Sequence, residues 1–366
     1  MTIYDPTALR RELHEMPELA LHEKRTSAYV AEKLKALGIE THENVGGSTG
    51  VVGIIRGTEP GPVFMLRADM DALPFVIDGK PCCIHACGHD GHTAMLLAAA
   101  SRLKDKIKRG TLKLLFQPAE ETLQGAPVII KAGVIDDVDY ALGAHIRPIQ
   151  DVPAGMLCAA VRHTASTTLT IVIKGRGAHA SRPHLGINAI DAACALMNGI
   201  QAIWLDPKMS WSAKATQIHA DSGATNTVPD LARITYDCRA QTNELMDDLL
   251  AQIRRVAAGT AAAYGAEAEV ILRDQSPACL YDDDFVAEVA EAIKETAGPD
   301  KLAPDCGGGG EDFHNYKLAR PEIKAAYFGV GVGAAPGLHA PTMHFDDMLL
   351  PLGVAVFENV VLRHLG

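Results

Sequence analysis

Regular alternation of strands and helices in the first 150 residues constrains the fold of this chain most. The predicted strands cover residues 51–56, 63–66, 112–116 and 140–143, and the predicted helices between them cover 90–103 and 126–132. Strands that alternate with helices favour an α/β fold with a parallel sheet. An amphipathic helical pattern precedes them, from Pro6 to Gly38, with a break expected near Pro17.

Polar side chains follow the predicted strands at the point where each strand ends. Asp69, Glu120, Glu121 and His145 each come just after such a strand. The carboxyl ends of parallel strands share one edge of the sheet, and sites in open α/β sheets are built there. We therefore expect these side chains to converge.

The pattern changes between residues 164 and 276. Strands and helices follow one another there in the order β-α-β-β-α-β, which is the order of a ferredoxin-like split unit. A chain of 366 residues is also long for a single core. The sequence therefore predicts two domains: residues 1–163 with 277–366, and an insertion of residues 164–276.

The run from His85 to His92 holds three imidazoles, a thiol and a carboxylate within eight residues. Cys87 and His89 are two apart, so in an extended lead-in both side chains can face one side. For His92 we expect a satisfied histidine inside the following helix. Asp90 is a candidate N-cap of that helix.

Cys87 and His89 become a candidate metal site when they are taken together with Glu121, His145 and a late histidine such as His339. Thiolate, imidazole and carboxylate are the ligands of Zn²⁺, with Mn²⁺, Co²⁺ or Ni²⁺ as further candidates. Five ligands suit two ions better than one, and a pair of ions can activate a bridging water.

The adjacent Glu120 and Glu121 can serve different roles, because neighbours in an extended segment point to opposite sides. One carboxylate can bind metal while the other handles the proton of the attacking water, and spacing alone does not say which. Asp69 and Asp90 are candidates for accepting a hydrogen bond from a ligand histidine. In the insertion, ionisable residues gather between Gly177 and His184.

Composition excludes several partners. The formal net charge is −11, and no basic run offsets it, so we expect neither nucleic acid nor membrane as a partner. No apolar stretch is expected to reach membrane-spanning length, and no signal peptide is expected at the N-terminus. Eight scattered cysteines suit a reducing cytoplasm. A thiol-redox protein using Cys82, Cys83 and Cys87 is an alternative, although no C-x-x-C spacing occurs.

Several motifs together resemble one known family. They are Arg67–Pro74, His85–His92, Gln117-Pro-Ala-Glu120-Glu121, Gly143-Ala-His145, Gly177-Ala-His179, Gly310-Glu-Asp-Phe313 and Leu338-His339-Ala-Pro341. The chain resembles the dinuclear metallo-aminoacylase/carboxypeptidase family of clan MH. Within that family it is most similar to the amidohydrolase subfamily of hippurate hydrolases and indole-acetyl-amino-acid amidohydrolases.

This resemblance implies a three-layer, zinc-peptidase-like catalytic domain with an inserted ferredoxin-like lid and dimerisation domain, hence a homodimer. It implies two divalent ions per subunit, Zn²⁺ or Mn²⁺ with Ni²⁺ or Co²⁺ as alternatives. The implied ligands are Cys87, His89, Glu121, His145 and His339, with Cys87 in the bridging position.

The resemblance also implies roles in the reaction. Glu120 would be general base and acid, with Asp69 beside it in the catalytic set. His179 would stabilise the oxyanion in the partner subunit's site. Asn226 and Arg239 would contact substrate, and Arg239 also has the chemistry to bind a carboxylate.

The expected function is metal-dependent hydrolysis of the amide of an N-acyl amino acid. Alternatives are a deacetylase of an intermediate such as N-acetyl-diaminopimelate, a metallodipeptidase, and a non-catalytic ligand-binding relative. The segment between Pro74 and His85 is shorter than is usual in the family, and it borders the expected site. Substrate preference is therefore the property that the sequence leaves open.

Overall fold

The chain divides into two compact units. A computed structural model describes residues 3–366. Unit 1 combines Met1–Arg162 with Leu280–Gly366, and unit 2 is the continuous insertion His163–Cys279. The two ends of the insertion meet, because the backbone amide of Cys279 donates to the carbonyl oxygen of His163 at 3.1 Å.

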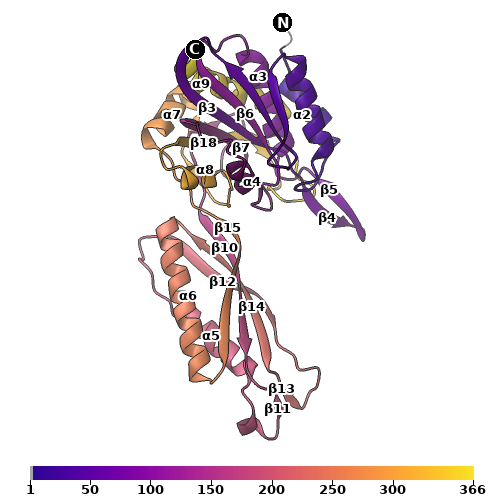
Figure 1. The fold of residues 1–366 in the computed structure, drawn as a ribbon, viewed down its shortest axis with the longest axis vertical. Coiled ribbons are helices and arrows are strands. Elements are labelled where there is room, and N and C mark those ends of the chain that lie inside the picture. Colours follow the sequence, from indigo (N-terminus) through magenta and orange to yellow (C-terminus); the bar gives the residue numbers. More distant parts are fainter. Residues whose placement is uncertain (1–2) are drawn as a thin grey trace. The chain divides into compact units, whose positions relative to one another are not determined.

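An eight-stranded mixed sheet forms the middle of unit 1 (Figure 1). In spatial order its strands are β1 (Glu40–Val45), β2 (Gly50–Arg56), β6 (Arg109–Gln117), β3 (Glu59–Asp69), β7 (Tyr140–Pro148), β18 (Lys324–Ala334), β8 (Leu157–Cys158) and β16 (Leu302–Ala303). The central strands β6, β3, β7 and β18 run parallel, as the alternation predicted. Their carboxyl ends therefore lie at one edge of the sheet.

Helices cover both faces of this sheet, which confirms the three-layer architecture. One face carries α1 (Pro6–His14), α2 (Lys24–Ala36), α3 (His89–Leu103), α7 (Asp283–Ala297) and α9 (Leu350–Leu365), and the other carries α4 (Gly125–Lys131) and α8 (His314–Ala319). Alternation along β3 serves both layers: Phe64 and Leu66 pack in the core under the first group of helices, and Met65 packs in the core under the second.

Two local predictions differ from the structure. The N-terminal helical pattern is interrupted over residues 15–23, a wider break than a proline kink. Strand β1 was not predicted, because Glu40–Val45 is polar and largely exposed at the edge of the sheet. It is held there by antiparallel pairing with the apolar strand β2.

The C-terminal helix is apolar over an unusual length. Residues Asp347–Leu365, which include the short 3₁₀ turn η3 (Asp347–Leu349), are long and apolar enough to cross a membrane by length and composition alone. This segment is an exception to the expectation that no apolar stretch reaches that length. Core helices pass the same test, and Val354, Phe357 and Val361 of α9 pack in the core of unit 1.

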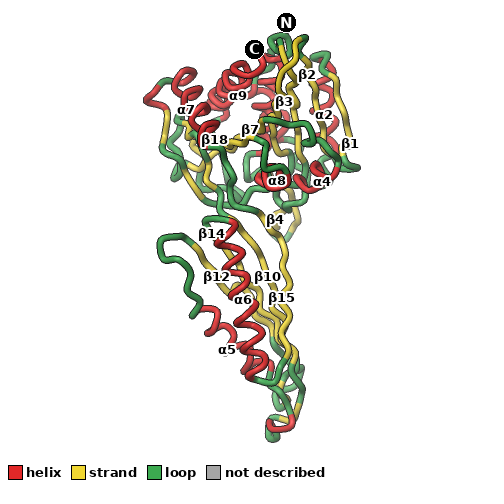
Figure 2. Tube along the Cα trace, turned by 60° about the vertical axis from the view of Figure 1, so that its left-hand side comes forward, coloured by secondary structure: helices red, strands yellow, loops and turns green. Residues whose placement is uncertain are grey.

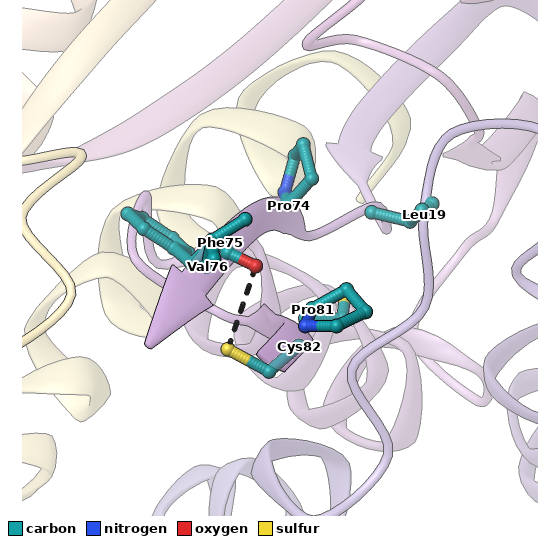
Figure 3. A pocket seen from close by; sticks show the side chains of 7 residues that line it. Leu19, Pro74, Phe75, Val76, Pro81 and Cys82 are labelled. Atoms are coloured by element: carbon teal, nitrogen blue, oxygen red, sulfur yellow. Dashed lines mark hydrogen bonds between the residues drawn. The ribbon is translucent and has the colours of Figure 1, made fainter. Parts of the chain in front are cut away.

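A β-hairpin connects the end of β3 to the cysteine-histidine run. It consists of β4 (Leu73–Ile77) and β5 (Lys80–Ile84), joined by Asp78 and Gly79, both with positive φ. An apolar pocket of about 470 Å³ lies against it (Figure 3). The pocket is lined by Leu19, Pro74, Phe75, Val76, Pro81, Cys82 and Cys83.

Unit 2 has the split β-α-β-β-α-β order that the sequence predicted. Its antiparallel sheet has the spatial order β12 (Trp211–His219), β14 (Leu231–Ala240), β10 (Ala165–Lys174) and β15 (Glu267–Ser276). Helices α5 (Ala189–Gln201) and α6 (Asn243–Ala263) pack on one face of this sheet (Figure 2). Strand β12 forms an edge, since it pairs with β14 alone among the strands of the described residues.

The remaining elements are short. They are the strand pair β11 (Ala178–His179) and β13 (Thr227–Val228), the strand pair β9 (Val161–Arg162) and β17 (Cys306–Gly307), and the 3₁₀ turns η1 (Pro183–Leu185) and η2 (Pro299–Lys301).

Candidate metal centre

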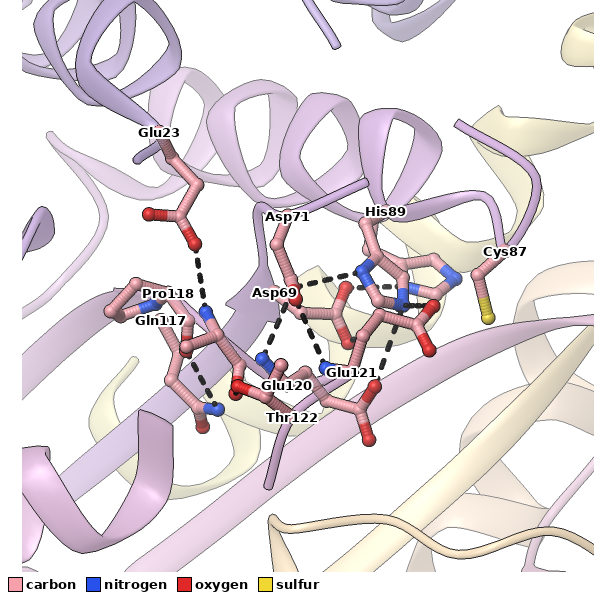
Figure 4. Close-up of polar contacts among 12 residues, drawn as sticks. Glu23, Asp69, Asp71, Cys87, His89, Gln117, Pro118, Glu120, Glu121 and Thr122 are labelled. Carbon is pink, nitrogen blue, oxygen red and sulfur yellow. Dashed lines mark hydrogen bonds and ion pairs between the residues drawn. The ribbon is translucent and has the colours of Figure 1, made fainter. Parts of the chain in front are cut away.

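The carboxyl edge of the parallel strands in unit 1 gathers five candidate ligands. Cys87, His89 and His145 have donor atoms within 4.8 Å of one another, and so do Cys87, Glu121 and His339. Both groups contain Cys87. The structure thus brings together all five residues expected to bind metal, with the cysteine common to two three-residue clusters. Figure 4 shows Cys87, His89 and Glu121 on neighbouring segments.

The donor atoms of this cluster lie close together, but they do not all satisfy one another by hydrogen bonding. Cys87 Sγ lies 3.4 Å from His145 Nε2, and His339 Nε2 lies 3.5 Å from Glu121 Oε2. His89 Nε2 and Glu121 Oε1 are 3.7 Å apart, and within residues 3–366 neither atom has a hydrogen-bond partner, although both are buried. A buried polar atom without a partner is costly. Coordination to a cation would satisfy both of these atoms.

The electrostatics of the cluster also fit a cation. Burial raises the pKa of Glu121, and it raises the pKa of the Cys87 thiol well above its usual value, with the charge of Glu121 adding to the effect. Burial lowers the pKa of His145, so its imidazole stays neutral, as metal binding requires. The Nδ1 of His145 lies 2.5 Å from the carbonyl oxygen of Ile146, which leaves Nε2 facing Cys87.

Asp71 contacts one candidate ligand and the backbone of the paired glutamates, a role that was not predicted from the sequence. Its Oδ1 lies 3.2 Å from His89 Nδ1, and its two carboxylate oxygens accept from the backbone amides of Glu120 at 3.1 Å and Glu121 at 3.0 Å (Figure 4). One buried carboxylate therefore orients a candidate ligand and the backbone of the paired glutamates. One indication of this role was present in the sequence, because Asp71 follows Asp69 by two residues in the same segment.

Asp69 has a different partner from the one expected. Its Oδ1 lies 2.6 Å from Nδ1 of His92, whereas His89 Nε2 is 3.8 Å from its Oδ2. His92 in turn accepts at Nε2 from the backbone amide of Ile146 at 2.9 Å. His92 is thus satisfied inside α3, as predicted, and it ties Asp69 to the strand that carries His145.

Asp90 does not support a candidate ligand. It lies within α3, after the N-cap Gly88, so it is not the N-cap either. Its Oδ2 binds Nδ1 of His14 at 2.7 Å and Nε of Arg10 at 2.9 Å. Asp90 therefore anchors α1 to the start of α3.

A buried guanidinium organises the carboxylates behind Glu120. Arg67 binds Asp69 at 2.7 Å, Asp312 at 2.8 Å and Glu311 at 2.9 Å, and all these side chains are buried. Burial, followed by the charge of Glu311, raises the pKa of Glu120 well above its usual value. Sequence analysis missed this network, although the Gly307–Gly310 run directly before Glu311 marked the segment.

The residues of unit 2 that were expected to contact the oxyanion or the substrate lie in two separate places. His179, in β11, is exposed, and its Nδ1 accepts from the Ser181 hydroxyl at 2.8 Å and the Ser181 amide at 3.1 Å. Asn226 comes just before β13, the partner of β11, and its carbonyl accepts from the amide of Ala180 at 2.8 Å. These two candidates are neighbours.

Arg239 lies instead on the four-stranded sheet of unit 2. Its guanidinium binds both carboxylate oxygens of Asp237, at 2.9 Å and 2.8 Å. In this structure the charge expected to bind substrate is therefore already paired within its own strand.

Sequence comparison connects the chain to characterised hydrolases. Residues 65–363 match the model of "Peptidase family M20/M25/M40". The chain is 35% identical to thermostable carboxypeptidase 1 of Saccharolobus solfataricus, covering 94% of this chain and 91% of that protein. It is 33% identical to hippurate hydrolase of Campylobacter jejuni, covering 98% and 96%. It is 31% identical to N-acetylcysteine deacetylase of Bacillus subtilis, covering 96% and 94%.

Solved structures agree with this connection. A protein of methicillin-resistant Staphylococcus aureus described as an aminohydrolase aligns with a TM-score of 0.90 at 29% identity, covering 99% of this chain and 96% of that one. A dinuclear metal binding peptidase from the M20 family, of Bacillus subtilis, aligns with a TM-score of 0.81 at 30% identity, covering 98% and 97%.

Proposed function

The chain belongs to the peptidase family M20/M25/M40, and from that premise we propose that it is a metal-dependent amidohydrolase of N-acyl amino acids. The reaction cleaves the amide to give a carboxylic acid and a free amino acid. The hippurate hydrolase and N-acetylcysteine deacetylase among its relatives act on amides of this kind.

One observation carries the proposal: five donors from separate segments converge, and two of their buried atoms have no hydrogen-bond partner among the residues that the structure describes. Cys87 belongs to both three-residue clusters, so the five residues would hold two ions with Cys87 available as a ligand to either. Sulfur in the donor set favours Zn²⁺, and the carboxylate and imidazoles also suit Mn²⁺, Co²⁺ or Ni²⁺. Two such ions would supply Lewis acidity to the substrate carbonyl and to the attacking water.

Glu120 handles the proton in this scheme. It takes the proton from the attacking water at a carboxylate oxygen and returns it to the nitrogen of the leaving amine. Burial and then the charge of Glu311 raise the pKa of Glu120. A carboxyl group with a raised pKa can keep the proton between these two steps. Asp71 fixes the backbone of Glu120, and Asp69 acts through His92 rather than on substrate.

Residues of unit 2 complete the proposal. With Nδ1 of His179 accepting from Ser181, a neutral imidazole carries its proton on Nε2, which can donate to an oxyanion. Asn226 and Arg239 are proposed substrate contacts. For Arg239 this role requires its pairing with Asp237 to be exchanged for a substrate carboxylate.

The substrate class is tested by a hydrolysis panel. The full chain is stripped with a chelator, reloaded with Zn²⁺, Mn²⁺, Co²⁺ or Ni²⁺, and assayed for release of the free amino acid. The panel contains hippurate, N-acetyl amino acids, indole-3-acetyl-aspartate, N-acetyl-diaminopimelate and dipeptides. We expect acyl amino acids to be cleaved by the reloaded protein only.

The same panel separates the alternatives. Selective cleavage of N-acetyl-diaminopimelate or of dipeptides would identify a biosynthetic deacetylase or a dipeptidase, and the carboxypeptidase relative favours testing peptides. Absence of turnover with every metal and substrate would indicate that the chain is a non-catalytic ligand-binding protein. Glu120→Gln keeps the size of the side chain, so it should retain metal while turnover falls about 10²–10⁴-fold. Undiminished turnover in that variant would refute the role of Glu120.

A homodimer formed through unit 2 is the proposed assembly. The edge strand β12 has open backbone groups, and Ile218 on it is 49% exposed. We expect the chain to sediment as a dimer and Ile218→Lys to weaken it, while Leu318→Lys, at an exposed apolar position in unit 1, leaves it unchanged. Mixing inactive Glu120→Gln with inactive His179→Ala should restore turnover if His179 serves the partner subunit's site.

A reducing, cytoplasmic location is proposed from the cysteines. No disulfide joins any of the cysteines within residues 3–366. Fractionation of source cells with an antibody to the chain tests this, and recovery outside the cytoplasmic fraction would contradict it.

A further inference from the structure

Two cysteines outside the metal centre face each other in unit 1. The Sγ atoms of Cys158 and Cys306 are 3.5 Å apart. Cys158 ends strand β8 and is fully buried, while Cys306 begins strand β17 and is partly exposed. Neither thiol takes part in the proposed hydrolysis.

Strand pairing brings the segments that carry the two cysteines together. The segment after Asp305 runs alongside the segment after Cys158, since β17 pairs in parallel with β9 and the amide of Cys306 donates to the carbonyl of Ala160 at 3.3 Å. Asp305 adds a side-chain bond to the amide of Ala160 at 3.2 Å. The register pairs Cys306 with Val161 and Cys158 with Ala303, so the two cysteines lie on adjacent segments but not directly opposite each other.

The two thiols differ in reactivity in the way that disulfide exchange requires. The hydrogen bond from Cys158, with the charge of Arg147 beyond it, lowers the pKa of Cys306 to about 7, although burial and Asp151 oppose this. The same bond and burial raise the pKa of Cys158. Cys306 is therefore the thiol that ionises first and the more accessible sulfur, and Cys158 is the buried partner.

We propose that Cys158 and Cys306 are a reversible oxidation site, which closes to an intramolecular disulfide by exchange with a small disulfide such as oxidised glutathione. The Cys306 thiolate attacks one sulfur of the reagent, forms a mixed disulfide and expels one thiolate, which takes up a proton. Cys158 then loses its proton to solvent, attacks the Cys306 sulfur and expels the second thiolate, which takes up a proton from solvent. Two protein thiols are oxidised and one small disulfide is reduced to two thiols.

The position of Cys306 gives the bond a structural consequence. The segment Gly307–Gly310 follows it directly, with positive φ at Gly308 and Gly309, and leads to Glu311 and Asp312 on the buried Arg67. A disulfide at Cys306 would fix the start of this glycine segment. The oxidation site is thus connected through one short segment to the carboxylates behind Glu120.

Peptide mapping of the metal-loaded full chain tests the proposal. After exposure to oxidised glutathione at neutral pH, free thiols are capped with N-ethylmaleimide and the chain is cut with trypsin without reduction. The fragments 132–162 and 302–317 each contain a single cysteine, Cys158 or Cys306. We expect these fragments to be recovered as one linked species that a reductant separates. Cys87 is in a different fragment, so any change at the metal centre is read independently.

Matched variants make the test decisive. Cys158→Ser should stop at a glutathione adduct on Cys306, and Cys306→Ser should leave Cys158 capped and unlinked. Cys194→Ser, at an exposed position in unit 2, should form the linked species as the unaltered chain does. If the unaltered chain gives both fragments capped, or gives a stable adduct on Cys306 with no link, the proposal is wrong.

Discussion

Asp71 contacts Nδ1 of His89 at 3.2 Å, and this contact orients the other ring nitrogen, Nε2, toward the candidate metal centre. A carboxylate in this position fixes both the tautomer and the direction of a ligand imidazole. Because the same carboxylate accepts from the amides of Glu120 and Glu121, it connects the candidate ligands His89 and Glu121 to Glu120, the proposed proton-handling residue.

Asp71→Asn should therefore weaken metal binding about 10–100-fold, the usual effect of losing such a partner. Competition with a chromogenic chelator measures it. Asp90→Asn is the matched control, because Asp90 is equally buried in the same region but binds His14 and Arg10. The control should lose stability and keep its metal affinity. Equal metal loss in both variants would argue against a specific role for Asp71.

Arg67→Met should destabilise unit 1 by about 3–5 kcal/mol, because it leaves Asp69, Glu311 and Asp312 buried without their cation. Chemical denaturation followed by circular dichroism measures the change. Arg56→Met removes an exposed pair with Glu40 and should leave the free energy of unfolding nearly unchanged. A cost for Arg67→Met as small as that of the control would mean that the buried carboxylates are neutral in the folded chain.

Gly88→Ala should disturb both stability and metal binding. Gly88 has φ of 92°, and an added Cβ would lie 2.2 Å from Cδ1 of Ile146, the residue after His145. Gly47→Ala separates the two causes, since Gly47 also has positive φ but has nothing within 4 Å of the added Cβ. The control should cost about 1 kcal/mol of backbone strain and leave metal affinity intact. A metal affinity unchanged in Gly88→Ala would show that Ile146 can yield without moving His145.

Alkylation of Cys306 should follow its thiolate fraction, so the rate should rise as the pH rises through about 7. Cys158→Ala removes the thiol whose hydrogen bond is the main cause of the lowered pKa, and the midpoint should move upward toward that of an ordinary cysteine. Mass spectrometry of fragment 302–317 after timed iodoacetamide treatment gives both curves. Superimposable curves would remove Cys158 as the cause.

The sequence predicted those parts of the site that depend on local order along the chain. The end of β6 places Glu120 and Glu121 at one edge, and the helix start places His89, because each position follows from the residues around it. His145 was expected just after its strand, but β7 continues to Pro148, so His145 lies within the strand. The paired roles of Asp69 and Asp71 could not be assigned in this way. Both follow the same strand, and only the position of α3 decides that His92 meets one and His89 the other.

Contacts between distant segments account for most of what was missed. Arg67 and Asp312 are 245 residues apart, and nothing in either segment identifies the other as its partner. Strand β1 was missed for a related reason: its side chains are polar, and pairing with β2 rather than its own pattern makes it a strand.

The contact between Cys279 and His163 bears on the order in which the chain folds during synthesis. Residues 163–279 leave the ribosome before β18, the strand that lies between β7 and β8, so unit 1 cannot complete its sheet until the whole of unit 2 has emerged. Once unit 2 folds, its two ends are held together, and the late strand and helices arrive beside the early ones without a long disordered loop to close. Mutations that unfold the insertion alone should therefore lower the yield of the metal-binding unit as well.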